Sequence, residues 1–146
     1  MNGIIFDWVG TLAERGRKLF PFSKEVLINL KSRGYKLGLV SIAGFGIERR
    51  WEDLQETGVI DFFDSIQIDV IKTPKHYLDC MKSMRTLPDS TIIVDNEMMA
   101  GIKLGNKLGC RTVWIQKGEY AHEIPNEDTG EPTYKIDSVK DLITLL

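Results

Sequence analysis

Four polar side chains have the types and the order along the chain that phosphoryl transfer requires. Asp7, Ser41 and Asp95 each follow a short apolar run directly, and Lys72 follows another run within two residues. One carboxylate can attack phosphorus, and both can bind Mg²⁺ through hard oxygen ligands. The hydroxyl and the ammonium can bind phosphoryl oxygens. A polar residue can also simply mark the end of a strand, but four of them in this order favour a phosphoryl-transfer centre.

The apolar runs before these residues are the elements that must position them. They are short, rich in Val and Ile and without strict polar alternation, which is typical of strands buried on both faces of a parallel sheet. In open α/β sheets, ligands bind outside the carboxyl ends of the strands, so the four side chains are expected to converge on one edge. The runs are Gly3–Phe6, Leu37–Val40, Ile66–Val70, Thr91–Val94 and Thr112–Ile115.

Segments with helical periodicity fill the intervals between the runs. Thr73-Pro74 is a good start for one of them, since it offers an N-cap followed by proline in the first turn. This alternation predicts an α/β fold with a three-layer, doubly wound, mostly parallel sheet, and we expect a single domain over residues 1–146. The apolar stripes run from Phe22 to Leu30, Ile47 to Leu54, Tyr77 to Met84 and Ile102 to Leu108, with a short last run from Val139 to Leu145 capped by Asp137 or Ser138.

Composition and charge predict where the protein works. A net charge of −2 suggests no standing affinity for nucleic acid or an anionic membrane. No apolar run approaches the roughly 20 residues of a membrane span, and the N-terminus lacks the features of a signal peptide. Cys80 and Cys110 are isolated and lack metal-type spacing, so we expect reduced thiols. The sequence therefore predicts a cytoplasmic protein with no nucleic-acid or membrane partner.

The segments around the four polar residues resemble the motifs of the haloacid dehalogenase (HAD) superfamily. Phe6-Asp7-Trp8-Val9-Gly10-Thr11-Leu12 is similar to its first motif, usually written DxDGT. Leu39-Val40-Ser41 resembles the second motif, Ile71-Lys72-Thr73-Pro74 the third, and Ile92-Ile93-Val94-Asp95-Asn96-Glu97 the fourth. The motifs cover almost the whole chain in the family's order. The resemblance implies a Rossmann-like hydrolase.

The resemblance also implies a role for individual residues. Asp7 would be the nucleophile that takes the phosphoryl group as an aspartyl-phosphate. The carboxylate of Asp7, the backbone carbonyl of Val9 and the side chain of Asp95 would bind Mg²⁺. Lys72 would hold phosphoryl oxygens and keep Asp7 ionised, because an opposite charge nearby favours the carboxylate.

Ser41 would bind phosphoryl oxygens together with Lys72, and Thr11 would lie at the substrate in the turn after the first strand. Two assignments stay open. Lys75 competes with Lys72 for the lysine of the third motif. Glu97 is a candidate ligand or nearby acid, because the second acidic position of the fourth motif falls near Met99.

Val9 departs from the pattern, because phosphatases of this superfamily generally carry Asp at that position. That Asp protonates the leaving alcohol, and such acid–base help contributes a factor of about 10²–10⁴ in rate. The run Asp7-Trp8-Val9-Gly10-Thr11 is close to the DWAGT of phosphonoacetaldehyde hydrolases, which take a Schiff-base lysine from a cap domain. The 34 positions from Asp7 to Ser41 and the 31 from Ser41 to Lys72 are filled by predicted elements, so we expect no cap.

A cap-less member has an open site, suited to large substrates or to small ones when a second copy in a homo-oligomer supplies the lid. Three hypotheses follow. The first is a Mg²⁺-dependent phosphatase acting on a phosphorylated substrate, and the presence of Asp7, Ser41, Lys72 and Asp95 together favours it. The second is a catalytically weakened binding or regulatory domain, which Val9 favours. The third is a hydrolase of dehalogenase or phosphonatase type.

Overall fold

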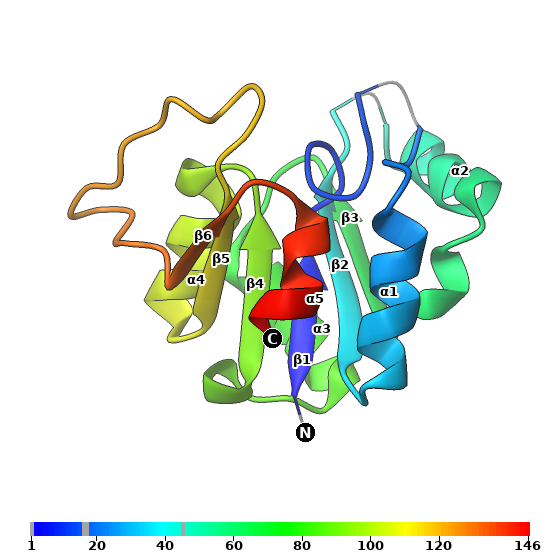
Figure 1. Ribbon diagram of the computed structural model, residues 1–146, viewed down its shortest axis with the longest axis horizontal. Coiled ribbons are helices and arrows are strands. Elements are labelled where there is room, and N and C mark those ends of the chain that lie inside the picture. The colour runs from blue at the N-terminus through cyan, green and yellow to red at the C-terminus, as the bar shows by residue number, and fades with distance from the viewer. Residues whose placement is uncertain (1, 16–17, 45) are drawn as a thin grey trace.

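The computed structural model describes residues 2–15, 18–44 and 46–146. A six-stranded, all-parallel sheet with the order β3-β2-β1-β4-β5-β6 lies between two layers of helices (Figure 1). The five predicted strands are confirmed, and β6 is an additional short strand at one edge. The strands are β1 (Gly3–Phe6), β2 (Lys36–Ile42), β3 (Ser65–Asp69), β4 (Thr91–Asp95), β5 (Arg111–Ile115) and β6 (Tyr134–Ile136).

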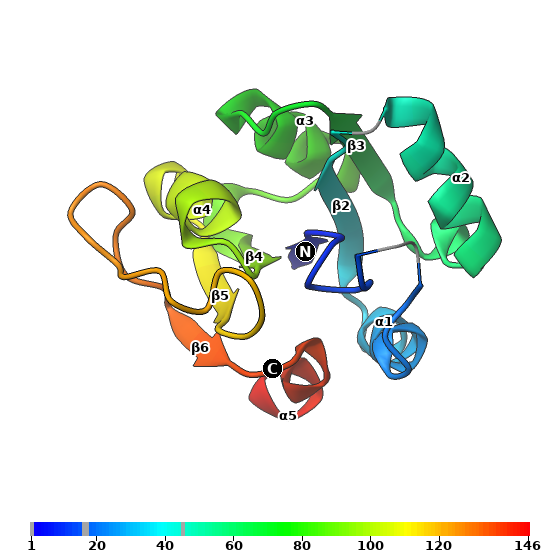
Figure 2. The same ribbon diagram turned by 90° about the horizontal axis from the view of Figure 1, so that it is seen from above.

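The helices cover both faces of the sheet, as Figure 2 shows from above. On one face lie α3 (Pro74–Met84) and α4 (Lys103–Leu108), and on the other lie α1 (Ser23–Ser32) and α5 (Leu142–Leu145). The remaining helix, α2 (Ile47–Thr57), lies beside β3. This arrangement confirms the predicted three-layer, doubly wound fold.

Strand β1 is central, and its side chains enter both halves of the core. Ile4 and Phe6 pack with the residues of α1 and α5, whereas Ile5 packs with those of α3. All three side chains are fully buried, and each contributes about 1.5–3 kcal/mol through the removal of apolar surface from water. The strand that leads to Asp7 is therefore held by the core on both faces of the sheet.

The intervals between the strands hold no second domain within the described residues. A loop and α1 connect β1 to β2, and α2 with a short 3₁₀ turn connects β2 to β3. The expected absence of a cap domain therefore holds for this part of the chain. None of the described helices is long and apolar enough to cross a membrane.

Two tryptophans of the flanking elements differ in burial. Trp114 on β5 is buried, whereas Trp51 on α2 is 37% exposed. This helix turns only Asp53 and Leu54 fully inward, because it covers the edge of the sheet beside β3 and not its centre.

Candidate active site

Asp7 and Asp95 lie at the carboxyl ends of the neighbouring strands β1 and β4. The two strands pair in parallel, and the backbone N–H of Asp7 donates to the carbonyl of Val94 at 3.0 Å. Asp7 therefore continues the ladder by one residue beyond β1. This register sets its side chain beside that of Asp95, as the positions of the two residues after their strands predicted.

Lys72 bridges the two carboxylates. Its Nζ lies 2.8 Å from Oδ1 of Asp7 and 2.9 Å from Oδ2 of Asp95. The side chain of Lys72 is 3% exposed, and those of Asp7 and Asp95 are 12% and 1% exposed. Water therefore screens these charges little, and Asp7 is the carboxylate that an incoming ligand can reach.

The competing lysine is oriented away from this cluster. Lys75 pairs with Asp79 one turn later on α3 at 2.5 Å, and its side chain is 82% exposed. The geometry therefore brings Lys72, and not Lys75, to the two carboxylates.

A second cluster fixes the turn that carries Lys72 from β3 to α3. Nδ1 of His76 lies 3.0 Å from the backbone nitrogen of Thr73, and Nε2 lies 2.9 Å from Oδ2 of Asp69. Because a backbone N–H can only donate, Nδ1 is the acceptor and Nε2 carries the proton toward Asp69. His76 is half-buried and ties the two ends of the Lys72 turn together.

The surroundings shift the ionisation of the cluster. Burial raises the pKa of Asp7 and so does repulsion from the nearby Asp95, whereas Lys72 lowers it; the net effect is a rise from the usual 3.8 to about 6. Burial alone would lower the pKa of Lys72, but the negative charges of Asp7 and Asp95 outweigh it and hold the pKa well above its usual value. Lys72 is thus a permanent cation beside a carboxylate that is ionised above about pH 6.

Thr11 and Ser41 are both buried, and each has a partner in the site. The hydroxyl of Thr11 donates to Oδ2 of Asp7 at 3.2 Å, so it orients the carboxylate. The hydroxyl of Ser41 accepts from the guanidinium of Arg50. Arg50 also donates to the carbonyl of Ile42 at 3.1 Å and to Oδ2 of Asp53 at 3.4 Å.

Arg50 was not predicted as a site residue. It brings a further cation to the pocket, next to the serine expected to bind phosphoryl oxygens. The signal that could have found it is an arginine in the first turn of the helix that follows the second motif.

Three oxygens of the site face one common point, at which the side-chain amide of Asn96 lies. With its nitrogen turned toward them, Asn96 donates to the carbonyl of Val9 at 3.3 Å, to Oδ2 of Asp7 at 3.1 Å and to Oδ1 of Asp95 at 3.1 Å. These are the three oxygens that the family resemblance assigns to Mg²⁺, and all are hard donors of the kind that Mg²⁺ prefers. The donor set therefore fits a divalent cation.

The set holds two carboxylates and one backbone carbonyl; the described residues contain no cluster of three or more His, Cys, Asp or Glu side chains suited to a metal. Burial raises the pKa of Glu97 to about 7, and repulsion from Asp95 acts in the same direction. The backbone N–H of Glu97 supports Asp95 by donating to its Oδ1 at 3.0 Å. Met99 is exposed and brings no ligand.

Two glycines allow the close packing around the carboxylates. A Cβ on Gly10, whose φ is +85°, would come within 2.1 Å of the amide of Asn96. A Cβ on Gly101 would come within 2.3 Å of Oδ2 of Asp95, to which the N–H of Gly101 donates at 2.9 Å. Side chains at these positions would displace the groups that form the site.

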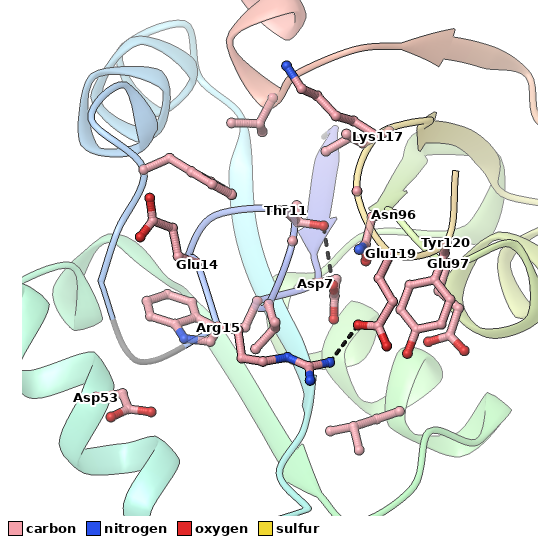
Figure 3. A pocket seen from close by; sticks show the side chains of 18 of the residues that line it. Asp7, Thr11, Glu14, Arg15, Asp53, Asn96, Glu97, Lys117, Glu119 and Tyr120 are labelled. Carbon is pink, nitrogen blue, oxygen red and sulfur yellow. Dashed lines mark hydrogen bonds and ion pairs between the residues drawn. The ribbon is translucent and has the colours of Figure 1, made fainter. Parts of the chain in front are cut away.

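An open pocket of about 1240 Å³ lies over the cluster and is lined by Asp7, Val9 and Lys72 among others. Figure 3 shows Arg15, from the loop after β1, reaching Glu119, from the loop after β5, near Asp7. Their ion pair measures 2.5 Å, but both side chains are mostly exposed, so it stabilises the loops by no more than about 1 kcal/mol. The site is therefore accessible to a ligand.

The chain is similar in sequence to proteins of known name. Two archaeal proteins named glyceraldehyde 3-phosphate phosphatase match it, one from Methanopyrus kandleri (28% identity; 88% of this chain and 57% of the relative) and one from Pyrococcus furiosus (27%; 86% and 53%). The chain thus spans about half the length of these relatives.

Solved structures share the fold at low sequence identity. An uncharacterized protein from Listeria monocytogenes serotype 4b superposes with a TM-score of 0.83 at 19% identity, covering 99% of this chain and 96% of that one. An HAD phosphatase from Thermococcus onnurineus gives 0.78 at 15% identity, covering 99% and 97%. These likenesses show the fold alone.

The family model described as haloacid dehalogenase-like hydrolase matches residues 4–115. This range runs from β1 to the end of β5 and contains Asp7, Ser41, Lys72 and Asp95. The chain therefore belongs to the haloacid dehalogenase-like hydrolase family.

Proposed function

We propose that the protein is a Mg²⁺-dependent phosphatase that acts through an aspartyl-phosphate on Asp7. The observation that carries this proposal is the bridge from Lys72 to both Asp7 and Asp95 at the mouth of an open pocket. Two buried carboxylates with no cation between them would repel each other. An ion pair with a purely structural role would need no access to a pocket. A partly exposed carboxylate held ionised beside a fixed cation suits nucleophilic attack on an anionic phosphate.

In the proposed reaction, a carboxylate oxygen of Asp7 forms a bond to phosphorus as the bond to the leaving alcohol breaks. Lys72 and the Ser41–Arg50 pair would bind the phosphoryl oxygens and offset their charge. Mg²⁺, held by Asp7, Val9 and Asp95, would supply further neutralisation when bound. Water then hydrolyses the aspartyl-phosphate and releases inorganic phosphate.

The leaving alcohol needs a proton, and the side chain of Val9 has none to give. The proton must therefore come from solvent, so substrates whose leaving group is a weak base should react fastest. The names of the archaeal relatives support a phosphate monoester as the substrate class. The open pocket supports access for substrates of varied size.

The test is turnover of a panel of phosphate monoesters with Mg²⁺ by native protein and by Asp7→Asn, with Asp89→Asn as the control. Asp89 is exposed and lies before β4, so its variant should match the native protein. We expect Asp7→Asn to be folded and inactive. Intact-protein mass spectrometry of quenched reactions should show one added phosphoryl group in the native protein only. Activity that persists in Asp7→Asn would reject the aspartyl-phosphate mechanism.

A second candidate function is that of a binding or regulatory domain without turnover, and Val9 is the observation that favours it. Such a domain would bind Mg²⁺ and a phosphorylated ligand at the same place. Saturable binding of Mg²⁺ by a protein that turns over no member of the panel and accumulates no phosphoryl adduct would decide for this function.

A further inference from the structure

Asn96 lies at the centre of the predicted cation site. Its residue is 5% exposed, and it follows directly on Asp95 at the end of β4. With its nitrogen turned toward them, its amide lies 3.1–3.3 Å from Oδ2 of Asp7, Oδ1 of Asp95 and the carbonyl of Val9. These are the same three oxygens that fit Mg²⁺, so the amide nitrogen and a bound cation would occupy the same position.

Two donors together hold the carboxylate pair. Lys72 contacts Oδ1 of Asp7 and Oδ2 of Asp95, whereas Asn96 contacts Oδ2 of Asp7 and Oδ1 of Asp95. Every oxygen of the two carboxylates thus has a donor from one of these side chains. The amide relieves repulsion on the side of the pair that Lys72 does not reach.

The two occupants cannot be accommodated at once. Mg²⁺ binds oxygen at about 2.0–2.1 Å, roughly 1 Å closer than the amide nitrogen lies. A cation drawn in to those distances would overlap the amide group. A neutral amide also offsets less charge than a divalent ion, so the cation can replace it at a net gain.

The position of Asn96 allows its side chain to leave without disturbing the strand. The backbone carbonyl of Asn96 accepts from the indole of Trp114 at 3.0 Å, which anchors the main chain. Gly10 closes one side of the amide, but Asn96 also lines the open pocket. Rotation of the side chain toward the pocket is therefore the available route.

We propose that Asn96 is a displaceable substitute for the cation: its amide holds the carboxylates together in the metal-free protein and must rotate away before Mg²⁺ binds. Asn96 then sets the apparent affinity for Mg²⁺ without being a ligand. The proposal rests on the metal site of the proposed function, but not on turnover.

Calorimetric titration of MgCl₂ into metal-free protein tests this, using native protein, Asn96→Ala, Asn96→Ser and the control Asn29→Ala. Asn29 lies on α1, away from the cluster. Hydrogen bonds to charged groups contribute enough that their loss in the metal-free state should tighten the Kd for Mg²⁺ about tenfold in both Asn96 variants. Asn29→Ala should bind like the native protein. Serine keeps a polar side chain but is too short to contact all three oxygens, so it serves if the alanine variant fails to fold.

Melting temperatures give an independent measurement. Without metal, the Asn96 variants should melt below the native protein, and saturating Mg²⁺ should reduce the difference, because the cation takes over the task of the amide. Equal or weaker Mg²⁺ affinity in both Asn96 variants would overturn the role of Asn96 while leaving the metal site intact. Absence of Mg²⁺ binding by all four proteins would instead reject the metal site and, with it, this proposal.

Discussion

Nζ of Lys72 lies 2.8 Å from Oδ1 of Asp7, although 65 positions separate the two residues in the chain. The contact joins the central strand β1 to the turn after the edge strand β3. Its formation requires β1, β2 and β3 to be paired, so the site and the sheet are assembled together. The charges of this small cluster lead to four predictions.

Replacement of Lys72 by Met should both destabilise the metal-free protein and abolish turnover. Removing one partner of a buried ion pair typically costs about 3–5 kcal/mol, because it leaves a buried charge unpaired. Lys75→Met is the matched control, and the loss of its exposed ion pair should cost less than about 1 kcal/mol. Urea unfolding in EDTA measures the stability of the two variants, and turnover of a phosphate monoester measures their activity. Equal effects of the two substitutions would contradict the assignment of Lys72.

Mg²⁺ should stabilise the native protein through its binding to Asp7, Val9 and Asp95. At a free concentration about 100 times Kd, ligand binding contributes about 2.7 kcal/mol, which corresponds to a rise in Tm of roughly 5–10 °C for a chain of this size. Differential scanning calorimetry should show this rise in the native protein and in the control Asp89→Asn, but not in Asp95→Asn. An equal rise in Asp95→Asn would place the cation elsewhere.

Val9→Asp should supply the proton that the site lacks. The rate gain should be largest for alkyl phosphates, up to the factor of about 10²–10⁴ typical of acid–base catalysis, and small for p-nitrophenyl phosphate. Val9 packs against the core, so burying a polar group there should cost about 1–3 kcal/mol of stability.

Asparagine has nearly the same shape as aspartate but no acidic proton, so Val9→Asn separates the effect of proton donation from the effect of burying a polar group. It should lose similar stability with no gain in rate. If both variants accelerate alkyl phosphate hydrolysis equally, proton donation is not the missing step. If both fold and stay inactive along with the native protein, the binding-domain hypothesis gains.

Stability should depend on pH through Asp7. Its pKa is raised from 3.8 to about 6 in the folded protein, so the unfolded chain loses this proton first as the pH rises. The stabilising contribution of the protonated group is therefore complete below about pH 4 and lost by about pH 6.

Asp7→Asn removes this titration, so in EDTA its stability relative to native protein should increase by about 2–3 kcal/mol between pH 4 and pH 7. The free energy of unfolding at both pH values, from urea titrations, measures the change. A constant difference between the two proteins would mean that Asp7 titrates near its usual pKa.

Much of the fold could be predicted from the sequence because β1 and its neighbours are buried on both faces. Such strands appear as continuous apolar runs, and a polar residue that ends a run marks the edge where ligands bind. This placed Asp7 and Asp95 together. By contrast, β6 has only three residues, two of them exposed, so the sequence contains no apolar run that would predict this strand.

The partners of the site residues could not be predicted, because they depend on side-chain directions. Lys72 and Lys75 are three residues apart, and only the path of the turn before α3 shows which one faces inward. Arg50 reaches Ser41 from a helix, and His76 reaches back to Asp69 across the Lys72 turn. In the sequence, neither Arg50 nor His76 has a spacing that differs from that of an ordinary residue on a helix surface.

The bridge formed by Lys72 also has a consequence for the order in which ligands arrive. One ammonium faces two carboxylates, so the metal-free cluster keeps one negative charge when both carboxylates are ionised. A phosphate dianion approaching it would be repelled, whereas binding of a divalent cation first would turn the net charge positive. We therefore expect obligatory sequential addition, metal before phosphate ester, with an association rate for the ester that falls as ionic strength rises.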